Sequence, residues 1–338
     1  MRDVSFHWPW YDTKKLPNTV PRTSTGVVRV GLPSAGTAAP SRPNEAIPRR
    51  TAAARRAGHT HRAPRRGATQ TQTVELFETT WENTIMDSTE ALKGQVALIT
   101  GAGKGIGRAC AMAFAKAGVD LILGLKNKNE QGEITDEIRK IGRSVLPLQM
   151  DISNLDEIRD AIRTGHDHFK RIDILVNNAG IGAPNPAENV TEQDFDETLN
   201  VNLKGTFFTA QAVGRIMIEQ RYGRIINISS QAGFVALSTE SIYCMTKAAI
   251  AHLTKCLALE WAPYNINVNA VAPTFIATPG TKKWLENQEF HQSVINRIPL
   301  GKVGDPMDVA EPVVFLASPA ASLITGTTLM IDGGWTIQ

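Results

Sequence analysis

From Leu92 to the end of the chain, short apolar runs suited to β-strands alternate with longer segments whose apolar residues recur at the helical period. Strands that alternate with helices predict one parallel sheet with helices on both faces. Right-handed crossovers make such a sheet doubly wound and place its ligand crevice at the carboxyl ends of the strands. The sequence therefore predicts one α/β domain of about seven strands over residues 86–338.

The predicted elements can be assigned to particular runs of residues. The strands are Val96–Thr100, Leu121–Leu125, Val145–Met150, Ile172–Val176, Ile225–Ser229, Ile266–Ala270 and Thr328–Ile331. The clearest helical segments are Gly105–Ala117, Asn154–Phe169, Asp194–Gln220 and Ser241–Trp261. About 250 residues suit a single domain of this kind.

The first 85 residues have a different composition from the rest of the chain. They hold 13 Lys and Arg residues against 6 Asp and Glu, a net charge of +7, whereas residues 86–338 carry −4. They also hold 8 of the 18 prolines, and neither the helical nor the strand period persists. Such a segment cannot bury enough apolar surface to offset its ordering entropy, so we expect a disordered basic extension.

Three interpretations of this extension are open. It is upstream sequence translated from a start codon placed too early, because Met86 opens a self-sufficient domain. Alternatively it is a native basic tail that touches acidic partners. The third interpretation is an organelle transit peptide, which six acidic residues and many prolines fit poorly. We favour the first and expect no role in binding nucleic acid.

Composition excludes several other classes. No apolar run approaches the roughly 18 residues needed to span a bilayer, so no membrane association is predicted. Cys110, Cys244 and Cys256 lack metal-site spacing and are interpreted as small core residues in a reducing compartment, which predicts a cytoplasmic protein. His166 and His168 have no third ligand nearby, and no metal is predicted.

A glycine-rich turn follows the first predicted strand and opens the first predicted helix. Its sequence is Thr100-Gly-Ala-Gly-Lys-Gly-Ile-Gly107, which places glycine at 101, 103, 105 and 107. Glycine permits a tight turn and a close approach of backbone to a pyrophosphate, whose charge the helix N-terminus stabilises. The turn therefore predicts a dinucleotide site.

Tyr243 and Lys247 are one helical turn apart, so their side chains share one helix face. A phenol has a pKa of about 10 in water, and a neighbouring ammonium favours its ionised form. Such a pair can exchange a proton with an alcohol oxygen. Ser230, thirteen residues before Tyr243, is a hydrogen-bond donor placed to orient that oxygen.

These motifs together resemble the short-chain dehydrogenase/reductase family, in its compact single-domain branch. TGAGKGIG resembles the family's TGxxxGxG, Asn177-Asn-Ala-Gly180 its NNAG, and Ser230 with Tyr243-Cys-Met-Thr-Lys247 its Ser…YxxxK. Asn200-Val-Asn202 carries its helix asparagine. The resemblance covers about residues 90–338 and implies a Rossmann-like fold, an NAD(P) cofactor and hydride transfer between a secondary alcohol and a ketone.

The resemblance also implies roles for individual residues. Tyr243 is the proton donor or acceptor, Lys247 binds the nicotinamide ribose and lowers the tyrosine pKa, and Ser230 holds the substrate oxygen. Asn202 holds a water that relays protons from Lys247. The implied cofactor contacts are Tyr243, Lys247, Gly101, Gly103, Lys104, Gly105, Ile106, Gly107, Lys126, Asp151, Ile152, Asn178, Ala179, Gly180, Ile276 and Thr278.

The residues after the second strand decide between NAD and NADP. An acid there would bind the ribose 2′-hydroxyl and repel a 2′-phosphate, but the chain has Leu125-Lys-Asn-Lys128. Lys126 and Lys104 can converge on a 2′-phosphate, although a solvated lysine pair is the ordinary alternative. Mainly because the acid is missing, we expect NADP(H) rather than NAD(H).

The substrate side is predicted more coarsely. Pro273-Thr-Phe-Ile-Ala-Thr278 resembles the family's PGxxxT, and Gly280–Ile298 is expected to form a mobile flap. Ser230 and Tyr243 are expected to contact the substrate. The further candidate contacts and pocket walls are Gln231, Glu240, Trp284, Phe290 and His291; for Gln231 and Glu240 an exposed position is equally open.

By general similarity the domain resembles sugar, polyol or sugar-acid dehydrogenases of the gluconate 5-dehydrogenase type. A 3-oxoacyl-(acyl-carrier-protein) reductase is the alternative within enzymes, although the charge of −4 disfavours docking of an acidic carrier. A non-catalytic NADP-binding scaffold or sensor is the alternative of another class. The resemblance further implies a homotetramer formed through Asp194–Gln220 and Ser241–Trp261.

Overall fold

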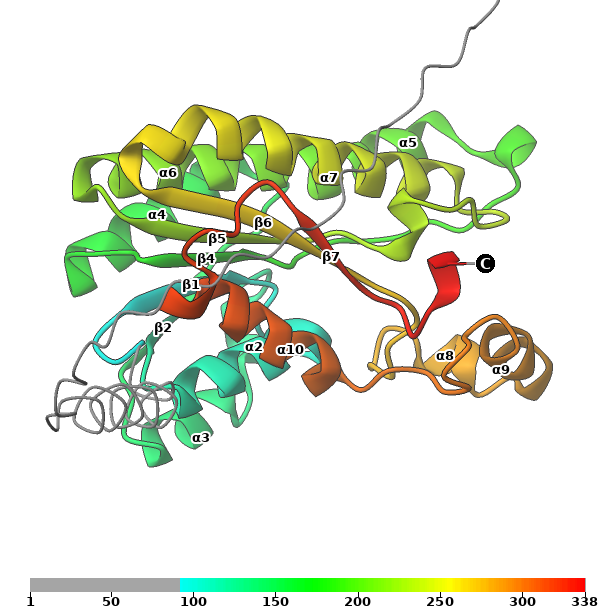
Figure 1. Cartoon of the computed structure of the whole chain (residues 1–338), viewed down its shortest axis with the longest axis horizontal. Coiled ribbons are helices and arrows are strands. Elements are labelled where there is room, and N and C mark those ends of the chain that lie inside the picture. The colour runs from blue at the N-terminus through cyan, green and yellow to red at the C-terminus, as the bar shows by residue number, and fades with distance from the viewer. Residues whose placement is uncertain (1–91, 338) are drawn as a thin grey trace, which may run out of the picture. The chain divides into compact units, whose positions relative to one another are not determined.

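The computed structural model of the chain describes residues 92–337. Seven parallel strands form one sheet in the order β3-β2-β1-β4-β5-β6-β7 (Figure 1). They are β1 (Val96–Thr100), β2 (Asp120–Leu125), β3 (Val145–Gln149), β4 (Ile174–Asn177), β5 (Gly223–Ile228), β6 (Ile266–Pro273) and β7 (Thr328–Ile331). The predicted doubly wound α/β fold is confirmed. The predictions for residues 1–85 lie outside the described residues.

Helices cover both faces of the sheet. Figure 1 shows α4, α6 and α7 on one face and α2, α3 and α10 on the other. The helices are α2 (Gly105–Lys116), α3 (Ile134–Lys140), α4 (Leu155–Phe169), α5 (Glu192–Leu199), α6 (Thr206–Gln220), α7 (Ser241–Trp261), α8 (Lys282–Leu285), α9 (Gln288–Ile295) and α10 (Pro306–Ala317). The short α8 and α9 occupy the segment that was expected to form a flap.

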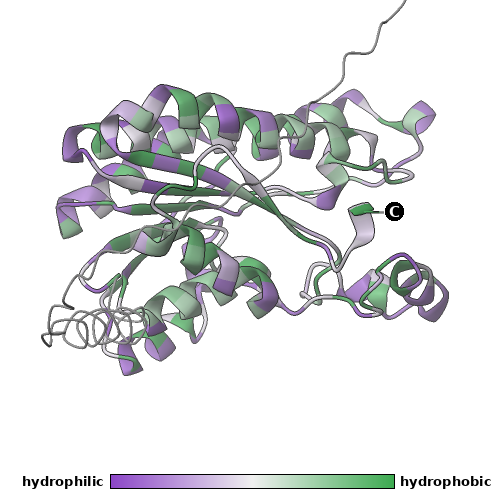
Figure 2. Ribbon diagram, in the orientation of Figure 1, coloured by the Kyte–Doolittle hydropathy of each residue, from purple (hydrophilic) through white to green (hydrophobic). Residues whose placement is uncertain are grey.

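The core consists of two apolar layers, one on each side of the sheet. Along β1, Ala97 and Ile99 belong to one layer, whereas Val96 and Leu98 belong to the other. This alternation follows from the two-residue period of a strand. Because helices cover both faces of the sheet, most of the residues along these strands are apolar. Figure 2 shows the helices carrying both hydrophobic and hydrophilic residues, as expected for elements with one buried side.

The chain order at β1 and β4 creates the ligand crevice. β1 lies between β2 and β4, and the connection that leaves β1 leads to β2 on one side, whereas the connection that leaves β4 leads to β5 on the other. A doubly wound sheet binds ligands at such a switch point. The glycine turn at the end of β1 therefore lies where a dinucleotide is expected.

One predicted helix is interrupted. Residues 194–220, expected to be a single helix, comprise α5, a π-helical segment Asn200–Gly205 and α6. A Cβ on Gly205 would collide with the carbonyl of Ile152, so the chain passes close to the segment that follows β3. π-Helical turns insert one residue into a helix, frequently at functional sites, and the apolar pattern does not reveal them.

The cysteines occupy unlike environments. Cys110 is buried on α2, and burial raises the pKa of its thiol to about 12. Cys244 is half-buried and Cys256 is exposed, so the expectation of a core position is wrong for Cys256, which lies on the outer side of α7. Among residues 92–337 no cluster of three potential metal ligands occurs. No helix in the same range is long and apolar enough to cross a membrane.

Candidate active site

The turn between β1 and α2 requires glycine at three positions. Gly101 and Gly105 have φ angles of +65° and +56°, which side-chain-bearing residues rarely adopt. At Gly107 the constraint is space, because a Cβ would collide with the carbonyl of Gly101 and with the amide of Asn178. The three glycines therefore fold the turn tightly against the end of β4.

The N-terminus of α2 is free of side-chain capping. Lys104 occupies the N-cap position with an extended backbone and makes no capping hydrogen bond, and the first turn of α2 holds no acidic residue. The first amide groups of a helix need partners and favour an anion. Thr278 lies across the turn, 3.3 Å from the position a Cβ on Gly105 would take. A dinucleotide pyrophosphate fits this cradle because the donors and the backbone space are both present.

The segment after β4 is fixed to the glycine turn by hydrogen bonds. The Asn178 side-chain amide donates to the carbonyls of Thr100 at 2.8 Å and Gly101 at 3.2 Å. The backbone amides of Asn178 and Ala179 donate to the Thr100 hydroxyl at 3.0 and 3.1 Å. Thr100 is thus a positioning residue that sequence reasoning did not assign, although it begins the predicted motif.

Asn202 is fully buried at the π-helical segment. Its side chain accepts a hydrogen bond from the Ile181 amide and donates one to the Ile181 carbonyl, both at 2.8 Å, and it also donates to the Thr246 hydroxyl at 3.1 Å. A Cβ on Gly180 would lie 3.3 Å from Asn202 Oδ1 and 3.5 Å from Lys247 Nζ. Asn202 and Lys247 therefore border the same glycine, and the proton relay between them stays a prediction.

Ser230 begins the short helical turn that follows β5. Its hydroxyl accepts a hydrogen bond from the Ala232 amide at 3.1 Å. The neighbouring Ser229 hydroxyl donates to the Lys247 carbonyl at 2.9 Å, and a Cβ on Gly233 would come within 2.8 Å of the Lys247 backbone. Ser229 and Gly233, neither of which was assigned a role, thus hold Ser230 against α7.

α7 presents Tyr243 and Lys247 to the same region. Lys247 is buried, and its ammonium donates to the Ile228 carbonyl at 2.8 Å. Its Nζ also lies 5.4 Å from the centroid of the Tyr243 ring. The shared helix face predicted from the four-residue spacing is therefore present, and β5 supplies the group that anchors the lysine.

Burial dominates the titration of this pair. It raises the pKa of Tyr243 to about 12, against a smaller lowering by a hydrogen bond with Ser230 and a further raising by the charge of Glu240. Burial also lowers the pKa of Lys247 to about 8. The predicted lowering of the Tyr243 pKa by Lys247 is not found in the chain alone. The ammonium faces the ring, and its own charged form is destabilised by burial.

A pocket of about 690 Å³ opens beside these residues, within the range of small-molecule sites. Phe275, Phe290 and Trp335 contribute apolar walls, whereas His291, which was expected to form part of the wall, does not line the pocket. The predicted site residues that line it are Ile106, Asn178, Gly180, Ser230, Gln231, Glu240, Tyr243, Lys247, Ile276, Thr278 and Trp284. Gly103 lies on the glycine turn itself.

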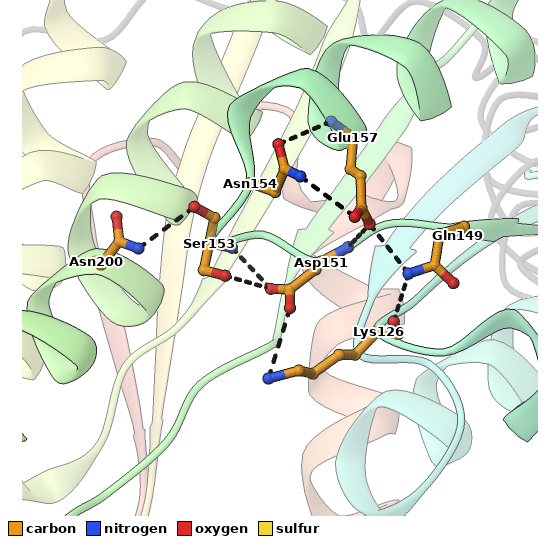
Figure 3. Close-up of polar contacts among 7 residues, drawn as sticks. All are labelled: Lys126, Gln149, Asp151, Ser153, Asn154, Glu157 and Asn200. Atoms are coloured by element: carbon orange, nitrogen blue, oxygen red, sulfur yellow. Dashed lines mark hydrogen bonds and ion pairs between the residues drawn. The ribbon is translucent and has the colours of Figure 1, made fainter.

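Lys126, at the end of β2, pairs with a carboxylate. Its Nζ lies 3.5 Å from Asp151 Oδ2, with the lysine side chain 75% exposed (Figure 3). Burial tends to raise the pKa of Asp151, but hydrogen bonds from Ser153 and the charge of Lys126 outweigh it and lower the pKa. The convergence of Lys126 and Lys104 on a 2′-phosphate stays a prediction, and in this structure the Lys126 ammonium lies beside the carboxylate of Asp151.

The segment after β3 is a rigid polar loop. Asp151 Oδ1 accepts from the Ser153 amide at 2.9 Å and from the Ser153 hydroxyl at 2.7 Å, and Glu157 accepts from the Asp151 amide at 2.8 Å. Figure 3 shows Asn200, from the π-helical segment, bonded to the Ser153 carbonyl at 3.3 Å. Ile152 is buried between these anchors. The loop thus joins the end of β3 to the segment that carries Asn202.

Comparison with known proteins agrees with this arrangement. Residues 101–336 match the family described as enoyl-(acyl carrier protein) reductase. The chain is 42% identical over 245 residues to an NAD-dependent glycerol dehydrogenase of Listeria innocua, covering 72% of the chain and 94% of the relative. It is 40% identical over 246 residues to a 3-oxoacyl-(acyl-carrier-protein) reductase of Thermotoga maritima, covering 73% and 99%.

A solved structure is similar as well. A gluconate 5-dehydrogenase from Burkholderia cenocepacia in complex with NADP and tartrate has a TM-score of 0.72 and 34% identity, and the match covers 75% of this chain and 99% of that one. Fold and site define an NAD(P)-dependent oxidoreductase that acts on CH–OH groups. The chain belongs to the short-chain dehydrogenase/reductase family, which confirms the resemblance.

Proposed function

We propose that the protein interconverts a secondary alcohol and a ketone on a sugar, a polyol or a sugar acid. The observation that carries the proposal is the convergence of Ser230, Tyr243 and Lys247 on one pocket beside an uncapped helix N-terminus. The glycerol dehydrogenase and gluconate 5-dehydrogenase relatives support the choice of a polyhydroxylated substrate.

The chain's own residues would carry the proton and orient the substrate. A bound nicotinamide dinucleotide supplies the hydride acceptor or donor. In the oxidation, the Tyr243 phenolate oxygen takes the hydroxyl proton from the substrate, and in the reduction the phenol returns it. The Ser230 hydroxyl bonds the same substrate oxygen and stabilises charge that develops there. Lys247 and Asn202, which border Gly180, provide the route by which the proton leaves.

We also propose that the protein prefers NADP(H) to NAD(H). Residues 126–128, directly after β2, include no acid. The side chain of Lys126 is 75% exposed, so its ammonium can turn from Asp151 toward a 2′-phosphate. The exposed Lys104 on the glycine turn adds a second cation near the dinucleotide. NADP bound to the Burkholderia relative supports this preference.

Fluorescence titration with NADPH and NADH, followed by a panel of sugars, polyols, sugar acids and ketones, tests both proposals. We expect tighter binding of NADPH and turnover of at least one polyhydroxylated substrate. Tight cofactor binding with no turnover of any alcohol or ketone would favour a scaffold or sensor instead. Tighter binding of NADH would refute the preference for NADP(H).

A 3-oxoacyl-(acyl-carrier-protein) reductase is a second candidate, supported by the 40% identical Thermotoga relative. Its substrate is carried by an acidic protein, which binds most readily to a basic face. Residues 86–338 carry a net charge of −4, which opposes such docking. Reduction of a 3-oxoacyl thioester on the carrier protein at a rate above that of any polyol reaction would favour this candidate.

We propose a cytoplasmic homotetramer built through α6 and α7. Exposed apolar residues on α5, α6 and α7 support the assembly: Phe195 is 40%, Phe207 37% and Leu259 81% exposed. Light scattering on the purified protein measures the mass. A monomeric mass at micromolar concentration would refute the tetramer.

A further inference from the structure

Glu240 lines the pocket, although its place at the start of α7 is one where side chains usually cap the helix. It is the N-cap residue of α7, yet its side chain makes no capping hydrogen bond. N-cap side chains are usually short and bond the first amides of the helix. One carboxylate oxygen, Oε2, is buried and has no hydrogen-bond partner, and Glu240 lines the pocket. The side chain is therefore available for a ligand rather than for its helix.

The carboxylate of Glu240 lies close to the reacting tyrosine. A Cβ on Gly182 would be 3.5 Å from Glu240 Oε2 and 3.7 Å from Tyr243 Cδ2, so the two side chains border one space above this glycine. Within residues 92–337 no cation pairs with Glu240. Lys247 is a buried cation that also lines the pocket, but it donates to the Ile228 carbonyl.

The backbone just before α7 is strained at Thr239, next to Glu240. Thr239 has a φ angle of +67°, an outlier for a β-branched residue. Its carbonyl accepts a hydrogen bond from the Asn185 amide at 2.8 Å, which holds the loop in place. Strain of this kind is found where the surrounding structure imposes it, frequently at binding sites. Here it sets the direction in which Glu240 leaves the backbone.

Gln231 adds a second acceptor without a partner. It is 1% exposed, it follows Ser230 directly, and its Oε1 is buried without a hydrogen bond in the same pocket. A buried polar atom left unpaired is costly, so a ligand that satisfies it binds more tightly. Both unpaired atoms accept hydrogen bonds, and hydroxyl groups are neutral donors that can satisfy them.

We infer that the substrate is a neutral polyol in which a second hydroxyl adjoins the reacting carbinol, and that Glu240 and Gln231 accept hydrogen bonds from hydroxyls beside the reacting one. This inference rests on the proposed alcohol–ketone reaction and narrows its substrate. An acid whose carboxylate adjoins the reacting carbinol would bring that carboxylate toward Glu240, and like charges in a partly desolvated pocket repel. Arg297 also lines this pocket, but it lies at the exposed rim over Trp335.

Three small substrates test the inference: propane-1,2-diol, propan-2-ol and lactate share a CH3–CH(OH) unit and differ in the third substituent of the carbinol carbon, which is CH2OH, CH3 or a carboxylate. The wild-type kcat/KM should favour the diol over propan-2-ol by about 10-fold or more, and lactate should be the poorest. Glu240→Gln keeps the shape and removes the charge. This substitution should lower the ratio of kcat/KM for the diol to kcat/KM for propan-2-ol by about 10-fold, mainly by raising KM for the diol. It should also raise kcat/KM for lactate relative to kcat/KM for the diol.

Glu289→Gln is the matched control, because Glu289 is an exposed carboxylate on α9 that does not line the pocket. It should leave the ratio unchanged. Gln231→Leu is the second variant and should also lower the diol-to-propan-2-ol ratio. A wild-type preference for lactate, or equal losses on diol and propan-2-ol in Glu240→Gln, would overturn the inference while the proposed reaction stands. Turnover of none of the three with NAD or NADP, nor of any other alcohol or ketone, would instead overturn the proposed function.

Discussion

The ammonium of Lys247 lies over the face of the Tyr243 ring, 5.4 Å from its centroid. A cation in this position interacts with the electron-rich ring face. The charged form of Lys247 is nevertheless destabilised by burial, and the phenol of Tyr243 stays protonated well beyond neutral pH. The pair is thus positioned by packing, and the ionisation that the reaction needs depends on what binds beside it.

Replacing Tyr243 by Phe tests the proton transfer. The substitution removes one hydroxyl and leaves the ring under Lys247, so the fold and the cofactor contacts should persist. We expect kcat to fall by about 1,000-fold or more and NADPH affinity to change less than about twofold. Tyr264→Phe, on the segment after α7, serves as the control with unchanged turnover. A large loss of NADPH affinity in Tyr243→Phe would contradict the role assigned to the hydroxyl.

The buried Lys247 should make stability depend on pH. Its folded pKa of about 8 lies below the ordinary value of 10.5, so the folded state binds fewer protons than the unfolded state between these values. The contribution of Lys247 to the free energy of unfolding should therefore rise as the pH increases from about 8 to 10.5. Deprotonation removes the cost of burying the charged side chain, which is on the order of 3 kcal/mol. Lys247→Met lacks the titration, so the stability of the wild type relative to this variant should increase from pH 7 to pH 10.

Urea unfolding at both pH values measures this difference. Lys255→Met is the control, because Lys255 is exposed on the same helix. Its stability should follow that of the wild type at both pH values. Parallel pH profiles for wild type and Lys247→Met would show that Lys247 is not held with a lowered pKa.

Lys126 should determine the preference for NADP(H). Removing its ammonium with Lys126→Ala leaves Asp151 unpaired beside the site, where a 2′-phosphate would be repelled. We expect the Kd for NADPH to rise by about 10-fold and the Kd for NADH to change little. Lys128→Ala, an exposed lysine two residues away, is the matched control. An equal rise in Kd for NADPH and NADH would show that Lys126 does not bind the 2′-phosphate.

Gly107 should be irreplaceable for steric reasons. A methyl group there would collide with the Gly101 carbonyl and the Asn178 amide, which together close the cradle. We expect Gly107→Ala to lose about 1–3 kcal/mol of stability and to bind NADPH at least 10-fold more weakly. At Gly280 the nearest atom is 3.6 Å away, so Gly280→Ala should melt like the wild type. Unchanged cofactor binding in Gly107→Ala would disprove the tight turn.

The sheet and the placement of Tyr243 beside Lys247 could be predicted because their signals are local. The apolar runs, the glycine turn and the four-residue spacing of Tyr243 and Lys247 each report a short-range constraint. The interruption at Asn200–Gly205 could not be predicted, because the apolar pattern continues through it. α10 was not among the clearest helical segments, and Pro312 lies inside it, where proline weakens a helical pattern.

The remaining site residues depend on contacts between distant segments. The Thr100 hydroxyl meets the Asn178 amide across 78 residues of sequence, and the Lys126 ammonium meets Asp151 across two strands. No spacing rule reports such a pair. The direction of the Tyr243 pKa shift could likewise not be predicted from the sequence, because the shift depends on how deeply the side chain is buried.

The final prediction concerns residues 1–85, whose removal we expect to leave the enzyme intact. The sheet, its covering helices and the pocket are all formed by residues 92–337, and Leu92 is already part of the buried core. The extension has a charge of +7, 8 prolines and no sustained apolar period, so it offers little surface to bury. The chain beginning at Met86 should keep its kcat/KM within about twofold and its Tm within about 2 °C. Scanning calorimetry and steady-state assays on both chains provide the comparison, and an insoluble or inactive shortened chain would show that the extension belongs to the working protein.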